Sequence, residues 1–344
     1  MPAIVAALGT HASVPAVAQY ACWALVNIAS IPAGQTACVS EGAVPAIVAA
    51  LRTQASVPAV AERACEALLN LTCASPPAIQ ACLAVGGEDL LRAAEASHPA
   101  ASKAACWALC NLSPAACADS RIAASAVAEI TLSLSMNAHC SSSFGTLLDC
   151  WSLANIAFTN PVGKNAIVER GGLAALVAVL GGPHASDPCV AAHACKALRN
   201  ISIAPDSESR KVACIDAGAV AALAAALSTH AGCPAVVLRA CLVLGNIAAI
   251  PVGQDACVAQ GAVPPIVAAL RDHAGEAGVV RYAAWALRIF AWSSASNRAA
   301  IVAAGAVPLL AAAHAAHRGE TRKNAGEALG RLGFNFLGKW VAVE

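Results

Sequence analysis

A short phrase recurs along the chain at a nearly constant interval. CWALVNIA at residues 22–29 returns as CEALLNLT, CWALCNLS, CWSLANIA, CKALRNIS and CLVLGNIA, with its cysteine and its asparagine in the same places. The asparagine column comprises Asn27, Asn70, Asn111, Asn155, Asn200 and Asn246, and it continues at Ile289 and Arg331. The asparagines are 43, 41, 44, 45 and 46 residues apart. Because a period in the low forties is typical of stacked helical repeats, the chain is predicted to form a solenoid rather than separate globular domains.

Glycine and proline divide each period into three helices. A short first helix ends at a glycine such as Gly42 or Gly218. The second helix carries a proline such as Pro45 in its first turn, where a missing N–H costs little. Another proline opens the third helix twelve residues before the asparagine, as at Pro15 and Pro58. The pattern therefore predicts three helices per period, with the first of them short.

Three helices per unit at this period resemble the armadillo repeat. Segments 31–52 (IPAGQTACVSEGAVPAIVAALR) and 250–271 (IPVGQDACVAQGAVPPIVAALR) nearly match although several periods separate them. The resemblance covers essentially the whole chain and implies an all-α fold, a right-handed α-solenoid (alpha-alpha superhelix) of armadillo repeats. Residues 1–30 then form a partial N-terminal repeat, and residues 31–344 form seven repeats with an atypical, capping C-terminal end, GFNFLGKWVAVE. Because Met1 aligns with Val44, the first unit lacks its short helix, which indicates a truncated fragment, a misplaced start or further solenoid upstream.

Composition excludes several classes of protein. The net charge is +1 with 12% charged residues, so no bulk attraction to nucleic acid or to a membrane surface is expected. The uncharged stretch 217–238 is interrupted by Gly232 and Pro234, which predicts a turn between helices and no transmembrane segment. The sixteen cysteines mostly occupy repeated helical positions instead of forming a small disulfide framework. We therefore expect an intracellular protein, located in the cytoplasm, with the nucleus as an alternative.

The recurring cysteine and its tryptophan neighbour fall on different faces of the third helix. At about 100° per residue, Cys22 clusters with Leu25 and Ile28, whereas Trp23 and Asn27 lie on the opposite side. A thiol on the apolar face behaves as a small hydrophobic group. The cysteine column is therefore predicted to be core and not catalytic.

The outward column suggests recognition of an extended peptide. The resemblance implies that the third helices line a concave surface on which the asparagines form a ladder, since an amide can pair with both peptide N–H and C=O. Tryptophans four residues before the asparagine column would form walls that hold aliphatic stems or cations. The alternative is that these side chains only stabilise neighbouring helices. The predicted groove consists of Trp23, Asn27, Asn70, Trp107, Asn111, Trp151, Asn155, Lys196, Asn200, Arg239, Asn246, Arg281 and Trp285.

The class of peptide follows from charge along this surface. The Trp–Asn pairs resemble importin-α, which would imply a nuclear-import adaptor for basic signals, but Arg63 and Lys103 dilute Glu62 and Glu66. The later repeats are more basic, at Lys196, Arg239, Arg281 and Lys323 and at Arg331, which replaces the asparagine, although Glu320 and Glu327 oppose them. Resemblance to β-catenin-type proteins implies acidic or phosphorylated segments here. A solvated face without a ligand remains the plainer alternative.

Neither metal chemistry nor catalysis is predicted. Several histidines lie sixteen residues before the column position, as at His230 and His273, but zinc ligands must converge at about 2 Å. Histidine at a helix C-terminus can instead bond free carbonyls. The nearest approach to a catalytic dyad is His139 beside Cys140, whose adjacent side chains point apart. We expect no enzyme, no catalytic residue, no metal and no cofactor, but a monomer that binds another protein.

Overall fold

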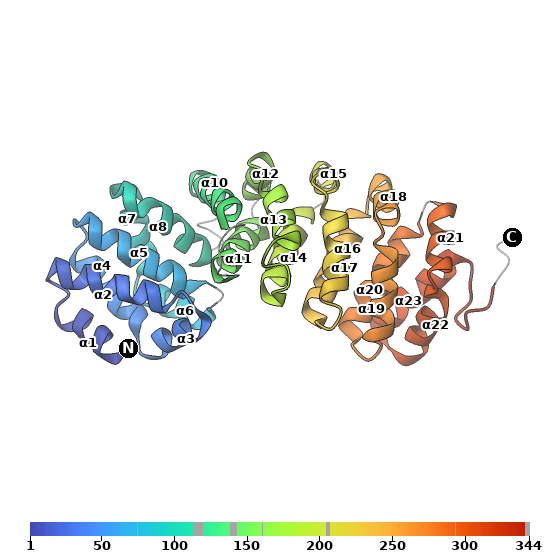
Figure 1. Ribbon diagram of the computed structural model, residues 1–344, viewed down its shortest axis with the longest axis horizontal. Coiled ribbons are helices and arrows are strands. Elements are labelled where there is room, and N and C mark those ends of the chain that lie inside the picture. Colours follow the sequence, from blue (N-terminus) through green and yellow to red (C-terminus); the bar gives the residue numbers. More distant parts are fainter. Residues whose placement is uncertain are drawn as a thin grey trace. The chain divides into compact units, whose positions relative to one another are not determined.

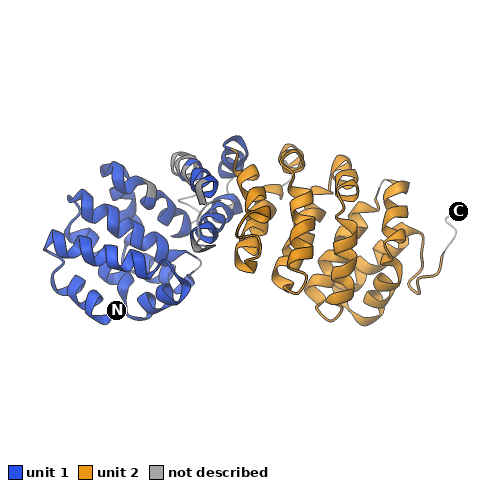
Figure 2. Ribbon diagram, viewed as in Figure 1, with its two compact units in different colours: residues 1–170 blue, residues 171–344 orange. Residues whose placement is uncertain are grey.

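The computed structural model describes residues 1–344 except 74, 113–119, 138–142, 160, 204–206, 293 and 341–344. Within these residues every regular element is a helix, apart from an isolated antiparallel bridge between Phe334 and Trp340 (Figure 1). The chain divides into two compact units, residues 1–170 and residues 171–344 (Figure 2). The predicted all-α solenoid with three helices per repeat is confirmed, as each unit shows in turn.

The first unit begins with a helix pair and continues in triples. The pair is α1 (Pro2–Thr10) and α2 (Pro15–Ile28). The triples are α3 (Pro32–Ser40), α4 (Ala43–Thr53) and α5 (Pro58–Thr72), then α6 (Pro76–Ala84), α7 (Gly87–Ser97) and α8 (Pro99–Leu112). The unit ends with α10 (Ser120–Asn137), α11 (Ser143–Thr159) and α12 (Pro161–Glu169). The third helices α2, α5 and α8 pack against one another in sequence order.

The second unit repeats this arrangement. It starts with α13 (Gly172–Gly181) and α14 (Pro188–Ser202). The triples that follow are α15 (Glu208–Asp216), α16 (Ala219–Thr229) and α17 (Pro234–Ile247), then α18 (Pro251–Ala259), α19 (Val263–Asp272) and α20 (Ala277–Phe290), then α21 (Ala295–Ala303), α22 (Ala306–Ala316) and α23 (Gly319–Leu332). The third helices α14, α17, α20 and α23 again pack in sequence order, so consecutive copies of the recurring phrase are neighbours.

The helix boundaries fall where glycine and proline predicted them. Pro15 and Pro58 occupy the first turn of α2 and α5, after residues in extended conformation. Gly42 and Gly218 precede α4 and α16 with φ of 73° and 80°, a left-handed conformation that other residues adopt only with strain. No other atom stands within 4 Å of a Cβ built on Gly42, so backbone conformation and not space selects glycine there.

The recurring cysteines are core residues, as predicted. Cys22, Cys65, Cys106, Cys150, Cys195 and Cys241 are all completely buried. Burial raises the pKa of the Cys22, Cys195 and Cys241 thiols from the ordinary 9.0 to about 12, because an apolar environment disfavours the thiolate. These thiols are therefore neutral packing groups and not nucleophiles.

The histidine column joins successive repeats, which corrects the expectation of capping within a single helix. His98, His230 and His273 do terminate α7, α16 and α19. However, each Nε2 donates to a carbonyl in the equivalent loop of the preceding repeat, with partners Ala55 (2.7 Å), Ala185 (2.7 Å) and Ala231 (2.6 Å). Gln54 makes the same bond to Ala12 (2.9 Å), and His317 makes it to Ala274 (2.8 Å).

We expect His230→Ala to destabilise the second unit by about 1–3 kcal/mol, because the Ala185 carbonyl loses its partner. His230→Gln should recover most of this loss, since Gln54 already makes the bond in another repeat. Urea unfolding followed by circular dichroism measures both variants. Equal losses for alanine and glutamine would show that the ring packs without a useful hydrogen bond.

Residues 333–340 form a compact loop on the last repeat. The Asn335 side-chain oxygen accepts from the backbone N–H groups of Leu337 (3.0 Å) and Lys339 (2.9 Å). Phe336 stacks on His314 of α22 with ring centroids 4.4 Å apart. Phe334 and Trp340 meet edge to face at 5.3 Å. The atypical C-terminal sequence therefore has a defined conformation against α22 and α23.

The described helices were compared with the length and apolar composition that a membrane-spanning helix needs. No single described helix combines the length and the apolar composition needed to cross a bilayer. Two bent pairs, α15 with α16 and α21 with α22, reach these criteria only when their helices are counted together.

Candidate peptide-binding surfaces

In the first unit, the predicted groove residues differ widely in exposure. Trp23 and Asn27 lie exposed on α2, and Trp23 contacts Tyr20 at a ring-centroid distance of 6.4 Å. Trp151 and Asn155 are half-buried on α11, whereas Trp107 on α8 is buried. The surface that a ligand can reach is therefore largest at α2.

Two asparagines of the first unit, Asn70 and Asn111, bond to neighbouring repeats. The Asn70 amide donates to the Val26 carbonyl at 3.2 Å. Asn111 is buried, donates to Thr72 Oγ1 and accepts from Ser152 Oγ, both at 3.4 Å. The sequence placed this column on an open face, but at Asn111 the structure places it between helices. Peptide binding by these amides stays a prediction.

Two acidic residues of α5, Glu62 and Glu66, are already paired. Arg63 lies between two carboxylates, with Nη1 2.6 Å from Glu66 and Nη2 3.5 Å from Glu62. One guanidinium between two carboxylates leaves this part of α5 with a single net negative charge, which is weaker than two free carboxylates would supply to a basic ligand.

In the second unit, the asparagines of the column are buried or half-buried. Asn200 is almost completely buried, and its oxygen accepts from Arg199 Nη1 at 3.2 Å. The Asn246 Nδ2 is a buried donor without a hydrogen-bond partner in the described structure. Lys196 and Arg239 are half-buried on α14 and α17. Among the described residues of the second unit, the column therefore holds one buried amide donor without a partner, at Asn246.

Trp285 packs against Gly245 of the preceding repeat, a contact that the sequence did not predict. A Cβ on Gly245 would stand 2.0 Å from its Cζ3 atom and 2.4 Å from its Cε3 atom. Only glycine leaves room for the indole between α17 and α20. The one available signal was the glycine directly before Asn246, inside a predicted helix.

Next to this indole, α20 and α23 enclose a basic pocket of about 240 Å³. Its lining comprises Arg281, Tyr282, Trp285, Arg288, Glu320, Lys323 and Asn324. Arg288 pairs with Glu327, yet its Nε is buried without a hydrogen-bond partner. Lys323 is only loosely paired with Glu320, at 3.9 Å. With Glu327 counted as the partner of Arg288, three cations stand against two carboxylates, and the pocket keeps a net positive charge.

Arg331, which replaces the asparagine in the last repeat, covers an aromatic ring. Its guanidinium carbon lies 3.4 Å from the ring centroid of the exposed Trp292. Partial desolvation and then repulsion from Arg288 lower the pKa of the Arg331 guanidinium, and Glu327 opposes them. This end of the second unit is thus an arginine and tryptophan surface rather than an asparagine ladder.

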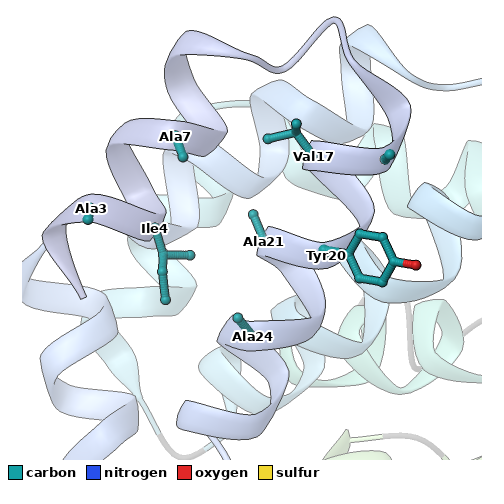
Figure 3. A pocket seen from close by; sticks show the side chains of 8 residues that line it. Ala3, Ile4, Ala7, Val17, Tyr20, Ala21 and Ala24 are labelled. Atoms are coloured by element: carbon teal, nitrogen blue, oxygen red, sulfur yellow. The ribbon is translucent and has the colours of Figure 1, made fainter.

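In the described part of the chain, no group of three His, Cys, Asp or Glu side chains lies close enough to hold a metal ion. His139 and Cys140 fall outside the described residues. A separate apolar pocket of about 500 Å³ lies between α1 and α2 (Figure 3).

Comparison with known proteins identifies the fold. No protein-family model matches the sequence, and no curated protein matches it. Among solved structures, an engineered protein is 28% identical, with 96% of this chain and 78% of that chain covered and a TM-score of 0.65. A designed armadillo repeat protein is 22% identical, with 84% and 99% covered and a TM-score of 0.54. The chain has an armadillo-type fold.

A second designed armadillo repeat protein was solved in complex with the peptide (KR)4. It is 21% identical, with 84% of this chain and 99% of that chain covered and a TM-score of 0.53. At this identity the likeness extends to the armadillo-type fold alone.

Proposed function

We propose that this armadillo-type chain is a non-catalytic scaffold that binds an extended segment of a partner protein along its third helices. In the second unit we propose a preference for acidic or phosphorylated segments. The observation that carries this preference is the basic pocket between α20 and α23.

Charge and hydrogen bonding support this preference. Arg281 is exposed on α20, and Lys323 faces the same pocket from α23, so two adjacent repeats present cations to one ligand. Arginine and lysine bind carboxylates and phosphates through charge-assisted hydrogen bonds. Trp285 supplies a wall against which the ligand's aliphatic carbons can pack.

The importin-α-like alternative requires negative charge. The designed neighbour binds a peptide of alternating lysine and arginine. In this chain, by contrast, Arg63 offsets one of the two carboxylate charges of Glu62 and Glu66 on α5, and the pocket of the second unit is positive. Recognition of basic signals is therefore the less favoured function.

The cysteines indicate where in or outside the cell the protein is located. The fourteen described cysteines are all free, and most of them are buried. Such a chain suits a reducing compartment, so we place this scaffold inside the cell.

We expect a glutamate-rich extended peptide to bind more tightly than its lysine-rich counterpart. The double variant Arg281→Ala/Lys323→Ala should bind the glutamate-rich peptide about tenfold more weakly or worse, because two charge-assisted hydrogen bonds are lost. Fluorescence anisotropy at low salt measures both. Arg271→Ala is the matched control, since Arg271 is an exposed arginine of α19 that does not line the pocket. Equal or better binding of the lysine-rich peptide would favour the import-adaptor alternative. Equal losses for both variants would mean that only general charge is sensed.

A further inference from the structure

The facing sides of α20 and α23 form a seam that extends beyond the basic pocket. Residues 281, 285, 288 and 292 of α20 are three or four positions apart, so they share one side of that helix. Four contacts join this side to α23, and from N- to C-terminus their pairs are Ala277–Thr321, Arg281–Asn324, Arg288–Glu327 and Trp292–Arg331. The pocket occupies the seam as far as Arg288, and the Trp292–Arg331 contact forms its other end.

Arg331 presents a cation at this end of the seam. Its guanidinium carbon lies 3.4 Å from the centroid of the Trp292 ring, so the guanidinium must lie flat on the indole, and its N–H groups point away from the stack. In the described part of the chain Arg331 forms no salt bridge, since the nearby Glu327 is paired with Arg288. Trp292 is 54% exposed, so a ligand can reach the stack. A guanidinium that is already oriented loses less entropy when it binds a carboxylate.

The distance between the pocket and Arg331 suits an extended peptide. Arg331 lies eight residues after Lys323 on α23, which is about 12 Å along the helix axis. An extended segment covers about 13 Å in four residues, and its residues i and i+4 point to the same side. Residue i+2 also faces the seam, where it meets the Arg288–Glu327 pair, whose charges cancel. The seam therefore fits two anionic side chains four residues apart, with an uncharged residue midway between them.

We propose that Arg331, held on Trp292, is a second anion-binding position, and that the seam selects extended segments with carboxylates at residues i and i+4. The first carboxylate binds Arg281 and Lys323 in the pocket, and the second binds the N–H groups of Arg331 through charge-assisted hydrogen bonds. The second carboxylate also offsets the repulsion between Arg331 and Arg288. This selection rests on the proposed preference of the second unit for acidic segments, to which it adds a contact and a spacing.

Three peptides that differ only in their second glutamate test this spacing. Each is blocked at both ends and carries a glutamate at position i among uncharged residues. The second glutamate stands at i+4, stands at i+3 or is replaced by glutamine. Fluorescence anisotropy at low salt is expected to show about tenfold tighter binding of the i+4 peptide than of the glutamine peptide. The i+3 peptide should bind like the glutamine peptide, because its second carboxylate faces away from the seam.

Variants of the stack separate Arg331 from the charge of the whole unit. Arg331→Gln removes the cation but keeps a planar group, and it should bind all three peptides with similar affinity. Trp292→Ala frees the guanidinium, so the preference for the i+4 peptide should shrink to about threefold. Arg271→Ala, at an exposed arginine of α19 outside the seam, should keep the tenfold preference. Circular dichroism checks that each variant is folded.

The outcomes distinguish this inference from the proposed function. A wild type that binds the i+4 and glutamine peptides equally would overturn the second position, and so would a tenfold preference that persists in Arg331→Gln. In both cases, binding that still weakens in Arg281→Ala/Lys323→Ala would leave the pocket as an acidic-segment site. A wild type that binds none of the glutamate peptides would overturn the second position together with the proposed preference.

Discussion

Above pH 9 the free energy of unfolding is expected to fall steeply. The folded chain keeps the protons of thiols such as Cys195, Cys214 and Cys241, whose pKa burial raises from 9.0 to about 12. The unfolded chain releases these protons near pH 9. Each such cysteine therefore lowers the stability by about 1.4 kcal/mol per pH unit between the two pKa values. The stabilisation is complete below pH 9 and is lost as the pH approaches 12.

Urea unfolding under reducing conditions at pH 7, 8, 9 and 10 measures this effect. Cys195→Ala/Cys241→Ala removes two of the titrating groups, so its stability should fall less steeply with pH than that of the wild type, even if it is less stable at pH 7. Cys189→Ala removes an exposed thiol and should follow the wild-type slope. Parallel curves for all three proteins would show that buried thiols do not govern the alkaline loss.

Gly245→Ala is expected to destabilise the second unit by about 1–3 kcal/mol, although alanine is the better helix former. The added methyl group would stand 2.0 Å from the Trp285 ring and would force the indole away from α17. Because Trp285 also lines the basic pocket, binding of acidic peptides should weaken in the same variant.

A second glycine in a helix interior gives the matched control. Gly330 of α23 has no atom within 4 Å of a built Cβ, so Gly330→Ala should stabilise by about 0.5–1 kcal/mol. In a Trp285→Ala background the clash is gone, and Gly245→Ala should then be neutral or stabilising. If Gly245→Ala in the wild type behaves like Gly330→Ala, the indole does not pack on that glycine.

The helical wheel predicted the exposure of some side chains correctly and of others wrongly. Cys22 and Leu25 are buried, and Trp23 and Asn27 are exposed, as their angles around α2 indicated. The same angles placed Asn111 outward, yet it is buried and bonded to Thr72 and Ser152. An angle about one helix axis says which way a side chain leaves that helix. It does not say how closely the next helix covers that side.

The histidines show the same limit. Their position at helix C-termini was evident from the spacing, but the bond from His230 to Ala185 spans 45 residues. A local rule favours the nearest free carbonyl, whereas the stacking of repeats brings the carbonyl of the preceding loop to 2.7 Å.

By itself, the sequence determined the repeat, the helix boundaries and the cysteine core. These features follow from short-range chemistry, such as the left-handed conformation at Gly42 and apolar periodicity, and recurrence in every unit reinforces them. Only the tertiary structure decided which side chains meet across neighbouring repeats. Trp285 on Gly245, the pocket between α20 and α23, and Arg331 on Trp292 all depend on how helices stack side by side. That lateral register is set by packing between residues about forty positions apart, so no local pattern reports it.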